Sequence, residues 1–350
     1  MEEKRDILSL TRAELETALQ EMGQPKFRAA QIFRWLHVRR VEHFAEMMDI
    51  PATLRERLDV EFCIKGLFVS QRLASSLDDT VKYLYTLPDG QHVECVLMHY
   101  KTGWRLCIST QVGCKMGCRF CASTIAGYVR DLTPSEMLLE IYETERREGV
   151  TISGLVLMGI GEPLDNFDNV MRFLALLSDP DGRGMSLRHV TLSTCGIVPR
   201  IRELAKLRLG LTLAVSLHSP EDAHRSTIMP VNRRYPLAEL MDACKAYFKA
   251  TGRRVTFEYA VMEGENDSMA DARALAALLR GTGSHVNLIP VNKVRERSYH
   301  ATRQAAMRFQ QMLEKLGVNA TVRRTLGSDI EAACGQLRHE SEKHKGGEGY

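Results

Sequence analysis

Three cysteines stand close enough in the sequence to bind a metal group together. Cys114, Cys118 and Cys121 lie in CKMGCRFC with the spacing C-x3-C-x2-C. Thiolates at such a spacing can bind three irons of a cubane iron–sulfur cluster, and a fourth cysteine would be needed to saturate it. The pattern therefore predicts a 4Fe–4S cluster whose remaining iron is open to a small molecule.

Zinc is the alternative for this cysteine group. A structural zinc site takes four ligands, usually as two pairs. No second Cys-x-x-Cys or histidine pair lies at a suitable spacing, although Cys107, seven residues before Cys114, would be a candidate fourth ligand. The spacing favours the cluster and leaves zinc as the alternative.

Further polar residues and glycines follow segments that are expected to be strands. They are Gly161 and Glu162 in MGIGEPLDN, Ser193 in VTLSTCG, Ser216 and His218 in VSLHSP, and Asn292 in NLIPVN. A Gly-x-Gly turn lets the backbone approach a ligand closely, and a carboxylate beside it can accept a hydrogen bond from an ammonium group. Taken singly, such glycines are mostly turns and such a histidine is mostly structural. Because all of these residues follow strands of one expected sheet, together they indicate a ligand site on one rim.

Cys334 lies among small residues in DIEAACGQL. A buried free cysteine is a common structural residue. The neighbours Ala332, Ala333 and Gly335 would equally give a bulky substrate room to reach the sulfur. The residues alone leave both roles open.

From about residue 105 the sequence alternates between short apolar runs and amphipathic stretches. The expected strands are 106–110, 154–159, 189–194, 211–217, 255–262, 285–291 and 319–324, and the expected helices lie near 133–148, 199–208, 236–250, 268–281 and 302–316. Thr133, Pro134 and Glu136 give the first of these helices a capping box with proline at its first position. Repeated βα units of this size imply a parallel sheet, and six or so indicate an open or complete barrel with its function at the carboxyl ends of the strands.

The first part of the chain has a different pattern. Up to about residue 90 the sequence predicts helices followed by a short β region, and KFRAAQIFRWLHVRRV (26–41) places apolar residues near a helical repeat among several positive charges. Pro88-Asp89-Gly90 is a turn signal within an alternating segment. It predicts one or two hairpins that lead into the next domain.

The composition limits the class of protein. Of the 350 residues, 44% are hydrophobic and 26% are charged, with a net charge of +3, which is typical of a soluble globular protein. The sequence shows no signal peptide and no apolar run of membrane-spanning length, so we expect a cytoplasmic protein without a membrane partner. In a reducing cytosol its nine cysteines more often bind metal or do chemistry than form disulfides. The polar, glycine-rich segment 341–350 is expected to be disordered.

The cysteine motif, with Phe120 before Cys121 and an expected strand before the motif, resembles that of the radical S-adenosylmethionine superfamily. This resemblance implies an α/β fold, a partial (β/α) barrel with a small helical N-terminal domain and a β extension. It also implies that the open iron binds the amino and carboxylate groups of S-adenosylmethionine. Reductive cleavage of that cofactor would yield a 5′-deoxyadenosyl radical.

Across nearly the whole chain the sequence is similar to one family within this superfamily. CISTQVGCKMGCRFC, MGIGEPLDN, VSLHSP, NLIPVN and AACGQL resemble the RNA adenine carbon-2 methyltransferases called RlmN, whose sister group Cfr methylates carbon-8. Pro163 in GEPL favours the carbon-2 group. The similarity implies an accessory RNA-binding domain with a β linker over 1–90 and a catalytic barrel over 91–340.

The resemblance implies methyl transfer through a cysteine. Cys334 would take a methyl group from one S-adenosylmethionine and become S-methylcysteine. A second S-adenosylmethionine at the cluster would give the radical that removes a hydrogen from this methyl group, and the thiomethylene radical would add to the adenine. Glu94 in HVECV matches the family position of the proton acceptor. Cys107 would then attack the Cys334 sulfur, which releases methylated RNA and leaves a disulfide.

The resemblance also assigns the remaining site residues. The S-adenosylmethionine contacts would be Gly161, Glu162, Ser193, Ser216, Leu217, His218 and Asn292. Cys195 departs from the family, in which serine is common at this position, and it adds a thiol near the rim. Cys63, Cys95 and Cys244 are expected to be structural.

The implied substrates are 23S ribosomal RNA and transfer RNA, whose target adenosine must leave its stack to reach the cysteine. Candidate phosphate contacts are Arg39, Arg40, Lys101, Arg105, Arg323 and Arg324. An electron donor such as flavodoxin or ferredoxin would reduce the cluster, and the chain is expected to be a monomer. The alternatives are a carbon-8 methyltransferase and, from another class, a metal-stabilised RNA-binding or chaperone module without turnover.

Overall fold

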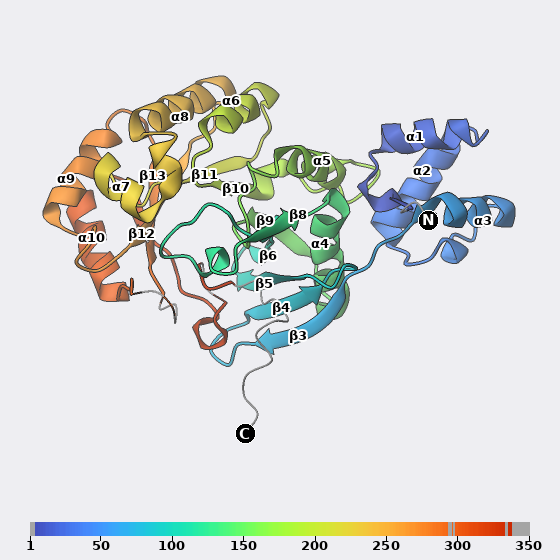
Figure 1. Ribbon diagram of the computed structural model, residues 1–350, viewed down its shortest axis with the longest axis horizontal. Coiled ribbons are helices and arrows are strands. Elements are labelled where there is room, and N and C mark those ends of the chain that lie inside the picture. Colours follow the sequence, from blue (N-terminus) through green and yellow to red (C-terminus); the bar gives the residue numbers. More distant parts are fainter. Residues whose placement is uncertain (1–3, 293–295, 297, 333–334, 338–350) are drawn as a thin grey trace.

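The computed structural model describes residues 4–292, 296, 298–332 and 335–337. Figure 1 shows a group of N-terminal helices at one end of the molecule, and a curved sheet with helices on its outer side in the rest. Cys334 and the whole segment after residue 337 lie outside the described residues. No helix of the described part has the length and apolar character that a membrane span requires.

Ten strands form one open sheet in the order β14-β13-β12-β11-β10-β9-β6-β5-β4-β3. Its parallel part consists of β6 (Gly103–Cys107), β9 (Ile152–Leu157), β10 (Val190–Thr194), β11 (Thr212–Ser216), β12 (Thr256–Val261), β13 (His285–Pro290) and β14 (Ala320–Val322). Because these strands are parallel neighbours, the side chains that follow them collect on one rim. The expected partial (β/α) barrel is confirmed, as an open sheet with edges β14 and β3.

Helices cover the outer face of the parallel part (Figure 1). They are α4 (Pro134–Glu148), α5 (Phe167–Ser178), α6 (Val198–Leu207), α7 (Asp222–Ile228), α8 (Leu237–Thr251), α9 (Met269–Leu278) and α10 (Arg303–Lys315). The capping box that the sequence predicts for α4 is present, since Thr133 N donates to the Glu136 carboxylate at 2.8 Å and the Thr133 side chain accepts from Glu136 N.

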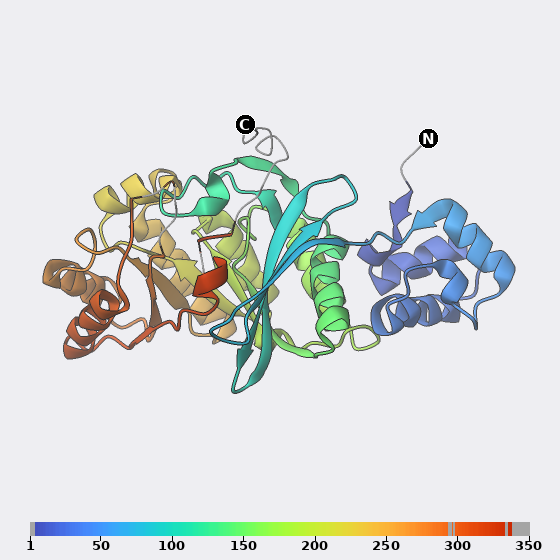
Figure 2. The same cartoon turned by 90° about the horizontal axis from the view of Figure 1, so that it is seen from below.

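Three antiparallel strands extend the sheet beyond β6. They are β3 (Phe68–Ala74), β4 (Val81–Thr86) and β5 (His92–Tyr100), and Figure 2 shows them as a long twisted ribbon across the middle of the molecule. The predicted turn Pro88-Asp89-Gly90 joins β4 to β5, with Gly90 at φ +80°. Although β3 and β4 precede residue 90, they belong to the same sheet as β5, and the domain division at residue 90 stays a prediction.

The segment 327–332 connects the two edges of the open sheet. It follows β14, the strand at one edge, and it contacts the loop between β3 and β4 at the other edge. Ser75 Oγ donates to the Asp329 carboxylate at 2.7 Å, and Gly327 N donates to the Asp78 carboxylate at 3.1 Å. The chain therefore crosses the side on which the barrel is open.

The N-terminal unit is a small helical group. It contains β1 (Arg5–Asp6), α1 (Arg12–Glu21), α2 (Phe27–Arg34), a π-helical turn (Trp35–Arg39), α3 (Ala52–Glu61) and β2 (Phe62–Cys63). β1 and β2 pair in parallel and so join the two ends of the unit. The unit packs against α4, where His37 Nδ1 lies 3.2 Å from the Tyr142 hydroxyl and Arg40 pairs with Glu145 at 2.6 Å.

The structure differs from the expected elements at one strand and at two helices. The strand expected at 106–110 is β6 at Gly103–Cys107, because the chain leaves the sheet afterwards and forms β7 (Gln111–Gly113), which pairs with β8 (Tyr128–Asp131). In addition, α5 and α7 lie in segments for which the sequence analysis predicts no helix.

Candidate active site

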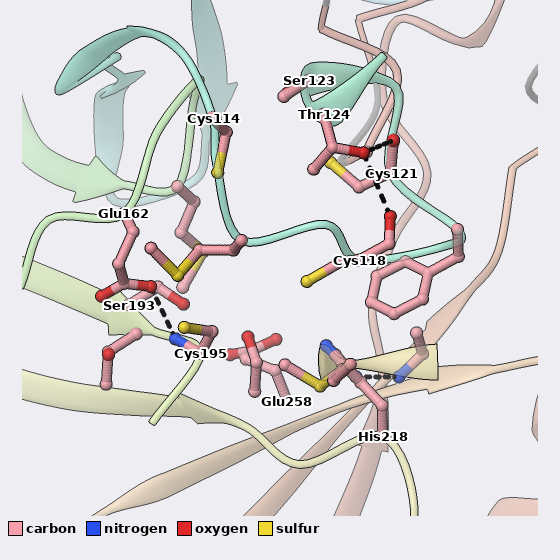
Figure 3. A pocket seen from close by; sticks show the side chains of 18 of the residues that line it. Cys114, Cys118, Cys121, Ser123, Thr124, Glu162, Ser193, Cys195, His218 and Glu258 are labelled. Atoms are coloured by element: carbon pink, nitrogen blue, oxygen red, sulfur yellow. Dashed lines mark hydrogen bonds between the residues drawn. The ribbon is translucent and has the colours of Figure 1, made fainter. Parts of the chain in front are cut away.

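One cavity at the carboxyl ends of the parallel strands contains the three motif cysteines. Its lining includes Cys114, Cys118, Cys121, Gly161, Glu162, Ser193, Ser216, His218 and Asn292. Figure 3 shows the Cys114 and Cys118 side chains pointing into the space bounded by Glu162 and His218. The open sheet thus brings together residues from separate segments of the sequence. Leu217, the remaining predicted contact, is fully buried, with its side chain in the hydrophobic core.

The loop that carries the cysteines is held in shape by two short strands and by hydrogen bonds to its backbone groups. β7 and β8 bracket it, and Thr124 Oγ1 donates to the carbonyls of Cys118 and Cys121 at 3.3 and 3.0 Å. Arg119 N donates to the carbonyl of Ile228, at the end of α7, at 2.9 Å. These bonds fix the relative placement of the cysteines and tie the loop to the barrel.

The electrostatic surroundings of the cysteines disfavour thiolates unless a cation is present. Burial raises the pKa of Cys114 to about 12, and the charges of Cys121 and Glu162 act in the same direction. Burial also raises the pKa of Cys118 well above its ordinary value. A bound cationic metal group reverses this preference, because it stabilises the thiolates that ligate it. The three cysteines therefore fit an iron–sulfur cluster, for which they would be the ligands.

A site for one metal ion is a separate question. Among residues 4–292, 296, 298–332 and 335–337, no group of three or more Cys, His, Asp or Glu side chains surrounds one point closely enough to hold an ion. A cubane cluster instead takes one thiolate on each of three irons. Cys107, the candidate fourth zinc ligand, lines a different cavity from the three motif cysteines.

The turn after β9 brings backbone and a carboxylate to the cavity. Gly161 has φ +108°, and a Cβ atom there would lie 2.6 Å from Gln111 Cβ, so the position requires glycine. The Glu162 carboxylate is 3% exposed and accepts hydrogen bonds from Cys195 N at 2.7 Å and Leu164 N at 3.1 Å. Burial raises the pKa of Glu162, and these N–H donors oppose the shift. The carboxylate is positioned to accept a hydrogen bond from a cationic ligand.

His218 presents a defined tautomer to the cavity. Its Nδ1 accepts a hydrogen bond from Ala260 N at 2.8 Å, so the neutral ring carries its proton on Nε2. Burial lowers the pKa of His218 to about 3, and the charge of Arg225 adds to this effect. The ring of Phe120 packs edge-on against the imidazole at 4.8 Å. His218 is therefore a neutral N–H donor at physiological pH, and Phe120 covers it beside the cysteine loop.

Arg225 organises the rim from inside. It is fully buried and donates to the carbonyls of Leu217 at 3.0 Å and Cys195 at 2.8 Å, and to Asn232 Oδ1 at 2.6 Å. The planar guanidinium fork can satisfy several acceptors at once, which a lysine cannot do. Arg225 thereby holds the ends of β10 and β11 together. The sequence analysis missed this residue, since α7 gives no sign that its arginine points inward.

Glu258 is a second acidic residue of the cavity that the sequence analysis missed. It is 4% exposed and stands between Ser216 and Asn287 in the register of β11, β12 and β13. Asn287 Nδ2 donates to its Oε2 at 2.8 Å. Burial raises the pKa of Glu258, while the charge of Arg323 and this hydrogen bond oppose the shift. The segment FEYAV looks like an ordinary strand, so its pattern could not mark the carboxylate as part of a site.

Cys107 lines a second cavity that adjoins the first. The two cavities share Met158, Ile289, Asn292 and Arg323. Ala332 and Leu337 line the second cavity as well, and both pack with Cys107 in one buried hydrophobic cluster. These two residues flank position 334 in the sequence.

The cysteine loop also holds the residues that follow position 334. Ala122 N donates to the Gly335 carbonyl at 2.8 Å, and Ser123 Oγ donates to the Leu337 carbonyl at 2.8 Å. Cys334 itself lies outside the described residues. Its described sequence neighbours therefore contact both the cysteine loop and the cavity of Cys107.

Glu94 lies on the same inner face of the sheet as Cys107. It precedes Val96 by two residues on β5, and Val96 stands opposite Cys107 on β6. Its carboxylate is buried and pairs with the Lys82 ammonium at 3.2 Å. The predicted proton acceptor is thus near the second cavity and has a cationic partner that the sequence analysis did not identify.

The candidate phosphate contacts fall into different surroundings. Arg105, Arg323 and Arg324 line a polar cavity inside the open barrel, together with Thr191, Thr212, Thr256, His285 and Asn287. Arg40 instead pairs with Glu145 and stacks over the Tyr142 ring at 4.6 Å. Since Arg40 is engaged between the N-terminal unit and α4, we do not retain it as an RNA contact.

Comparisons with known proteins agree with this architecture. The family model of the radical SAM superfamily matches residues 108–276, and that of the ribosomal RNA large subunit methyltransferase N-terminal domain matches residues 5–64.

Relatives are similar over almost the whole chain. A probable dual-specificity RNA methyltransferase RlmN from Lachnoclostridium phytofermentans is 49% identical over 340 residues, which cover 96% of this chain and 95% of the relative. One from Clostridioides difficile is 46% identical over 342 residues, covering 97% and 99%. The crystal structure of a radical SAM methyltransferase from Sphaerobacter thermophilus superposes with a TM-score of 0.90 at 42% identity, covering 95% of this chain and 99% of that one.

Proposed function

The chain belongs to the radical S-adenosylmethionine superfamily and, within it, to the dual-specificity RNA methyltransferases RlmN, and we propose that it methylates carbon-2 of one adenosine in 23S ribosomal RNA and in transfer RNA. It is thus a radical S-adenosylmethionine-dependent RNA methyltransferase, of a superfamily that uses a 4Fe–4S cluster and S-adenosylmethionine. The atom that is methylated, the RNA targets and the route of the methyl group are parts of the proposal.

The observation that carries the proposal is the junction of the two cavities. The first holds the cysteine triad with Glu162 and His218, and the second holds Cys107 beside the sequence neighbours of Cys334. A methyl group carried by Cys334 would need access to both cavities. In the first cavity a hydrogen atom would be removed from it, and in the second Cys107 would release it from the Cys334 sulfur. This arrangement supports a two-part reaction better than a binding module without turnover.

The cofactor-binding roles follow from the first cavity. Cys114, Cys118 and Cys121 would hold three irons, and Gly161, Glu162, Ser193, Ser216, His218 and Asn292 would bind S-adenosylmethionine. We keep Leu217 in this set for its backbone, because its side chain is in the core. Bound together, cluster and S-adenosylmethionine would supply the radical that removes a hydrogen atom from the methyl group on Cys334.

The remaining steps use groups of the chain itself. Cys334 first accepts the methyl group on its sulfur, and later its methylene carbon bonds to the adenine ring. Glu94 accepts the ring proton. The adduct must also give up one electron, which the oxidised cluster would accept. The Cys107 thiolate then attacks the Cys334 sulfur, so that the sulfur–carbon bond breaks with its electron pair on the carbon attached to adenine. This carbon takes up a proton and becomes the methyl group, while Cys107 and Cys334 form a disulfide. The packing of Cys107 against Ala332 and Leu337 supports this last step.

Partners of the reaction are proposed from the family and from the charges of the described residues. The N-terminal unit would be an accessory RNA-binding domain, and Arg105, Arg323 and Arg324 would face the substrate from the barrel interior. Since such contacts neutralise phosphates, binding should weaken as salt increases. We expect flavodoxin or ferredoxin as electron donor, and a monomeric enzyme.

The decisive experiment is anaerobic incubation of cluster-reconstituted protein with reductant, S-adenosylmethionine and 23S or transfer RNA, followed by nucleoside mass spectrometry with chromatographic standards. We expect 2-methyladenosine from the wild type and none from Cys334→Ala or Cys118→Ala. Cys244→Ala is the matched control, because Cys244 is buried outside both cavities, and it should retain activity.

Two results would contradict the proposal. Chromatographic identification of 8-methyladenosine would place the enzyme in the sister group. A zinc-containing protein that forms no methyladenosine and does not cleave S-adenosylmethionine would be a binding module.

In the proposed mechanism Cys107→Ala should accumulate a covalent complex of protein and RNA, visible as a shifted band in denaturing electrophoresis.

A further inference from the structure

Lys82 is a buried lysine on the inner face of the sheet. It is 8% exposed, and its ammonium has two partners, the Glu94 carboxylate at 3.2 Å and the Glu331 carbonyl at 3.3 Å. A buried ammonium is costly unless it is paired and hydrogen bonded. The two partners belong to β5 and to the segment 327–332, which are more than 200 residues apart in the sequence.

The strand register places Lys82 in line with the proposed resolving cysteine. Lys82 stands opposite Val96 on β5, and Val96 stands opposite Cys107 on β6. Side chains in such a row share one face of the sheet, with strands about 5 Å apart. Glu94 is diagonal to Lys82 on this face, since it stands opposite Leu84. Lys82, Glu94 and Cys107 therefore face the same side.

We propose that Lys82 is a positioning residue of the methyl-transfer site, which keeps the Glu94 carboxylate ionised and ties it to the segment that leads to Cys334. The inference rests on the function proposed above, in which Glu94 accepts the adenine ring proton and Cys334 carries the methyl group. The inference is carried by the two contacts of the Lys82 ammonium, one with the Glu94 carboxylate and one with the Glu331 carbonyl.

The first part of the role is electrostatic. Burial favours a neutral carboxyl group, which cannot accept a proton, whereas a contacting ammonium favours the ionised form. The titratable groups that share this face with Glu94 are Lys82 from β4 and Cys107 from β6, whereas the Cys95 thiol points to the opposite face, towards Thr144 of α4. Arg323 and Arg324 line the adjoining cavity, and Glu331 lies on the overlying segment. Lys82 contacts the Glu94 carboxylate directly, so its removal takes away a cation that favours the ionised form at this buried position.

The second part of the role is geometric. The Glu331 carbonyl that Lys82 binds is in a residue at φ +49°, a left-handed conformation that is unfavourable without glycine. Ala332 N closes the same turn by donating to the Gly327 carbonyl at 3.0 Å. Lys82 thus stabilises the turn directly before Cys334 with the same ammonium that pairs with Glu94.

The test compares the wild type with Lys82→Met, which removes the charge, and Lys82→Arg, which keeps it. Arg183→Met is the matched control, because Arg183 forms a comparably buried pair with Glu145 at 2.7 Å on the far side of the sheet, at α4. Three quantities are measured: methylation of Cys334 by intact-protein mass, the pH dependence of single-turnover methyladenosine formation, and amide hydrogen exchange of the peptide containing 327–332.

Lys82→Met should still accept a methyl group on Cys334, at a rate lowered by the looser segment 327–332 but not by protonation of Glu94, which has no role in that step. Its methyladenosine formation should fall at least about tenfold at pH 7, and the acid limb of its rate profile should move up by about one pH unit or more. Lys82→Arg should restore the position of that limb. Exchange in 327–332 should be faster in Lys82→Met and unchanged in Arg183→Met.

Different failures are distinguishable. If the wild type forms no methylated cysteine and no methyladenosine, the proposed function is wrong, while the exchange measurement still tests the tie between Lys82 and Glu331. If the wild type is active but Lys82→Met keeps the wild-type pH profile, or Lys82→Arg shows the same displaced limb as Lys82→Met, the positioning role is overturned. A Lys82→Met protein with faster exchange throughout the chain has lost its fold. In that case the pH–rate profile of Lys82→Arg decides: an acid limb at the wild-type position supports the positioning role, and a displaced limb overturns it.

Discussion

At the scale of single residues, the cavity gathers acidic groups whose ionised forms are unfavourable there. Burial raises the pKa values of Cys114, Glu162 and Glu258, and all three line one space. Such a set is stabilised by a positively charged ligand and destabilised without it. The cluster irons and the ammonium and sulfonium groups of S-adenosylmethionine have the required charge. Ligand binding should therefore contribute substantially to the stability of the protein.

Replacing Gly161 by alanine tests how closely the backbone must approach the ligand. The new Cβ would lie 2.6 Å from Gln111 Cβ at a backbone φ of +108°. We expect a loss of about 1–3 kcal/mol in unfolding free energy from this conformation. We also expect at least about tenfold weaker binding of S-adenosylmethionine to the reconstituted protein, because the turn must move. Urea denaturation and equilibrium binding measure the two effects.

Gly149→Ala is the control for backbone strain alone. Gly149 ends α4 at φ +64° with nothing within 4 Å of its added Cβ. It should lose about 1 kcal/mol of stability and bind S-adenosylmethionine like the wild type. Unchanged binding by Gly161→Ala would show that this turn does not approach the ligand.

At the scale of elements, the shape of the cysteine loop depends on the two short strands at its ends and on one side chain within it. β7 and β8 hold its ends, and one hydroxyl, that of Thr124, binds the carbonyls of Cys118 and Cys121 inside it. A change of loop shape would move all three thiols relative to one another. The loop is therefore the element whose order most directly determines cluster binding.

Thr124→Val keeps the size of this side chain but removes both hydrogen bonds. The variant should bind less iron and sulfide per chain after anaerobic reconstitution, and it should lose its cluster faster to a chelator, because the loop is no longer preorganised. Ser123→Ala is the neighbouring control. It removes only the bond to the Leu337 carbonyl and should load a full cluster. Equal loading of both variants would exclude a role for Thr124.

Much of this element order is predictable from the sequence, for physical reasons that can be named. The capping box of Thr133 and Glu136 specifies where α4 begins. The parallel strands β9 to β13 are apolar runs that lie between helical segments. The rim site is also predictable, because parallel strands must place their ends together. α5 was missed although Phe167, Val170 and Phe173 give it an apolar face, and α7 is too short to show a period.

Charged residues that point inward are the part that the sequence does not reveal. Arg225, Glu258 and Lys82 are all buried, yet nothing in their local sequence distinguishes them from exposed residues. Their partners are carbonyls and side chains of other elements, brought near only by the folded sheet. Burial of a charge is a property of tertiary structure, so these residues could be identified only once the strand register was known.

At the scale of the whole molecule, the N-terminal unit is joined to the barrel through α4, and through α5 and the loop that follows it. Arg40 pairs with Glu145, and His37 is fully buried with its ring 4.3 Å from that of Phe33 and its Nδ1 beside the Tyr142 hydroxyl. Burial lowers the pKa of His37 to about 3. The junction is therefore built around a neutral histidine.

This junction should make stability fall in mild acid. An unfolded chain binds a proton at His37 below about pH 6.5, whereas the folded chain does so only near pH 3. Unfolding is therefore favoured progressively as the pH falls from 6.5 towards 3. His37→Phe removes this proton uptake and should lose about 2 kcal/mol less unfolding free energy than wild type between pH 7 and pH 5. Chemical denaturation at several pH values measures the difference.

His43→Phe provides the comparison for this measurement. His43 is exposed on the same N-terminal unit, and its replacement controls for the loss of a histidine that is not buried in the junction. An acid-induced loss of stability in His37→Phe equal to that of wild type would mean that the histidine at the junction is protonated in the folded protein.

The segment 327–332 that spans the open side of the barrel also affects how the protein can be assembled during translation. Its bonds to the β3–β4 loop join residues 249 to 254 positions apart. At typical ribosomal rates the loop waits about 12–50 s for its partner to be synthesised. During that interval the parallel strands are synthesised, and the segment that joins the two edges of the sheet comes after them. The two edges of the open sheet can therefore be joined only after all of its strands have been synthesised.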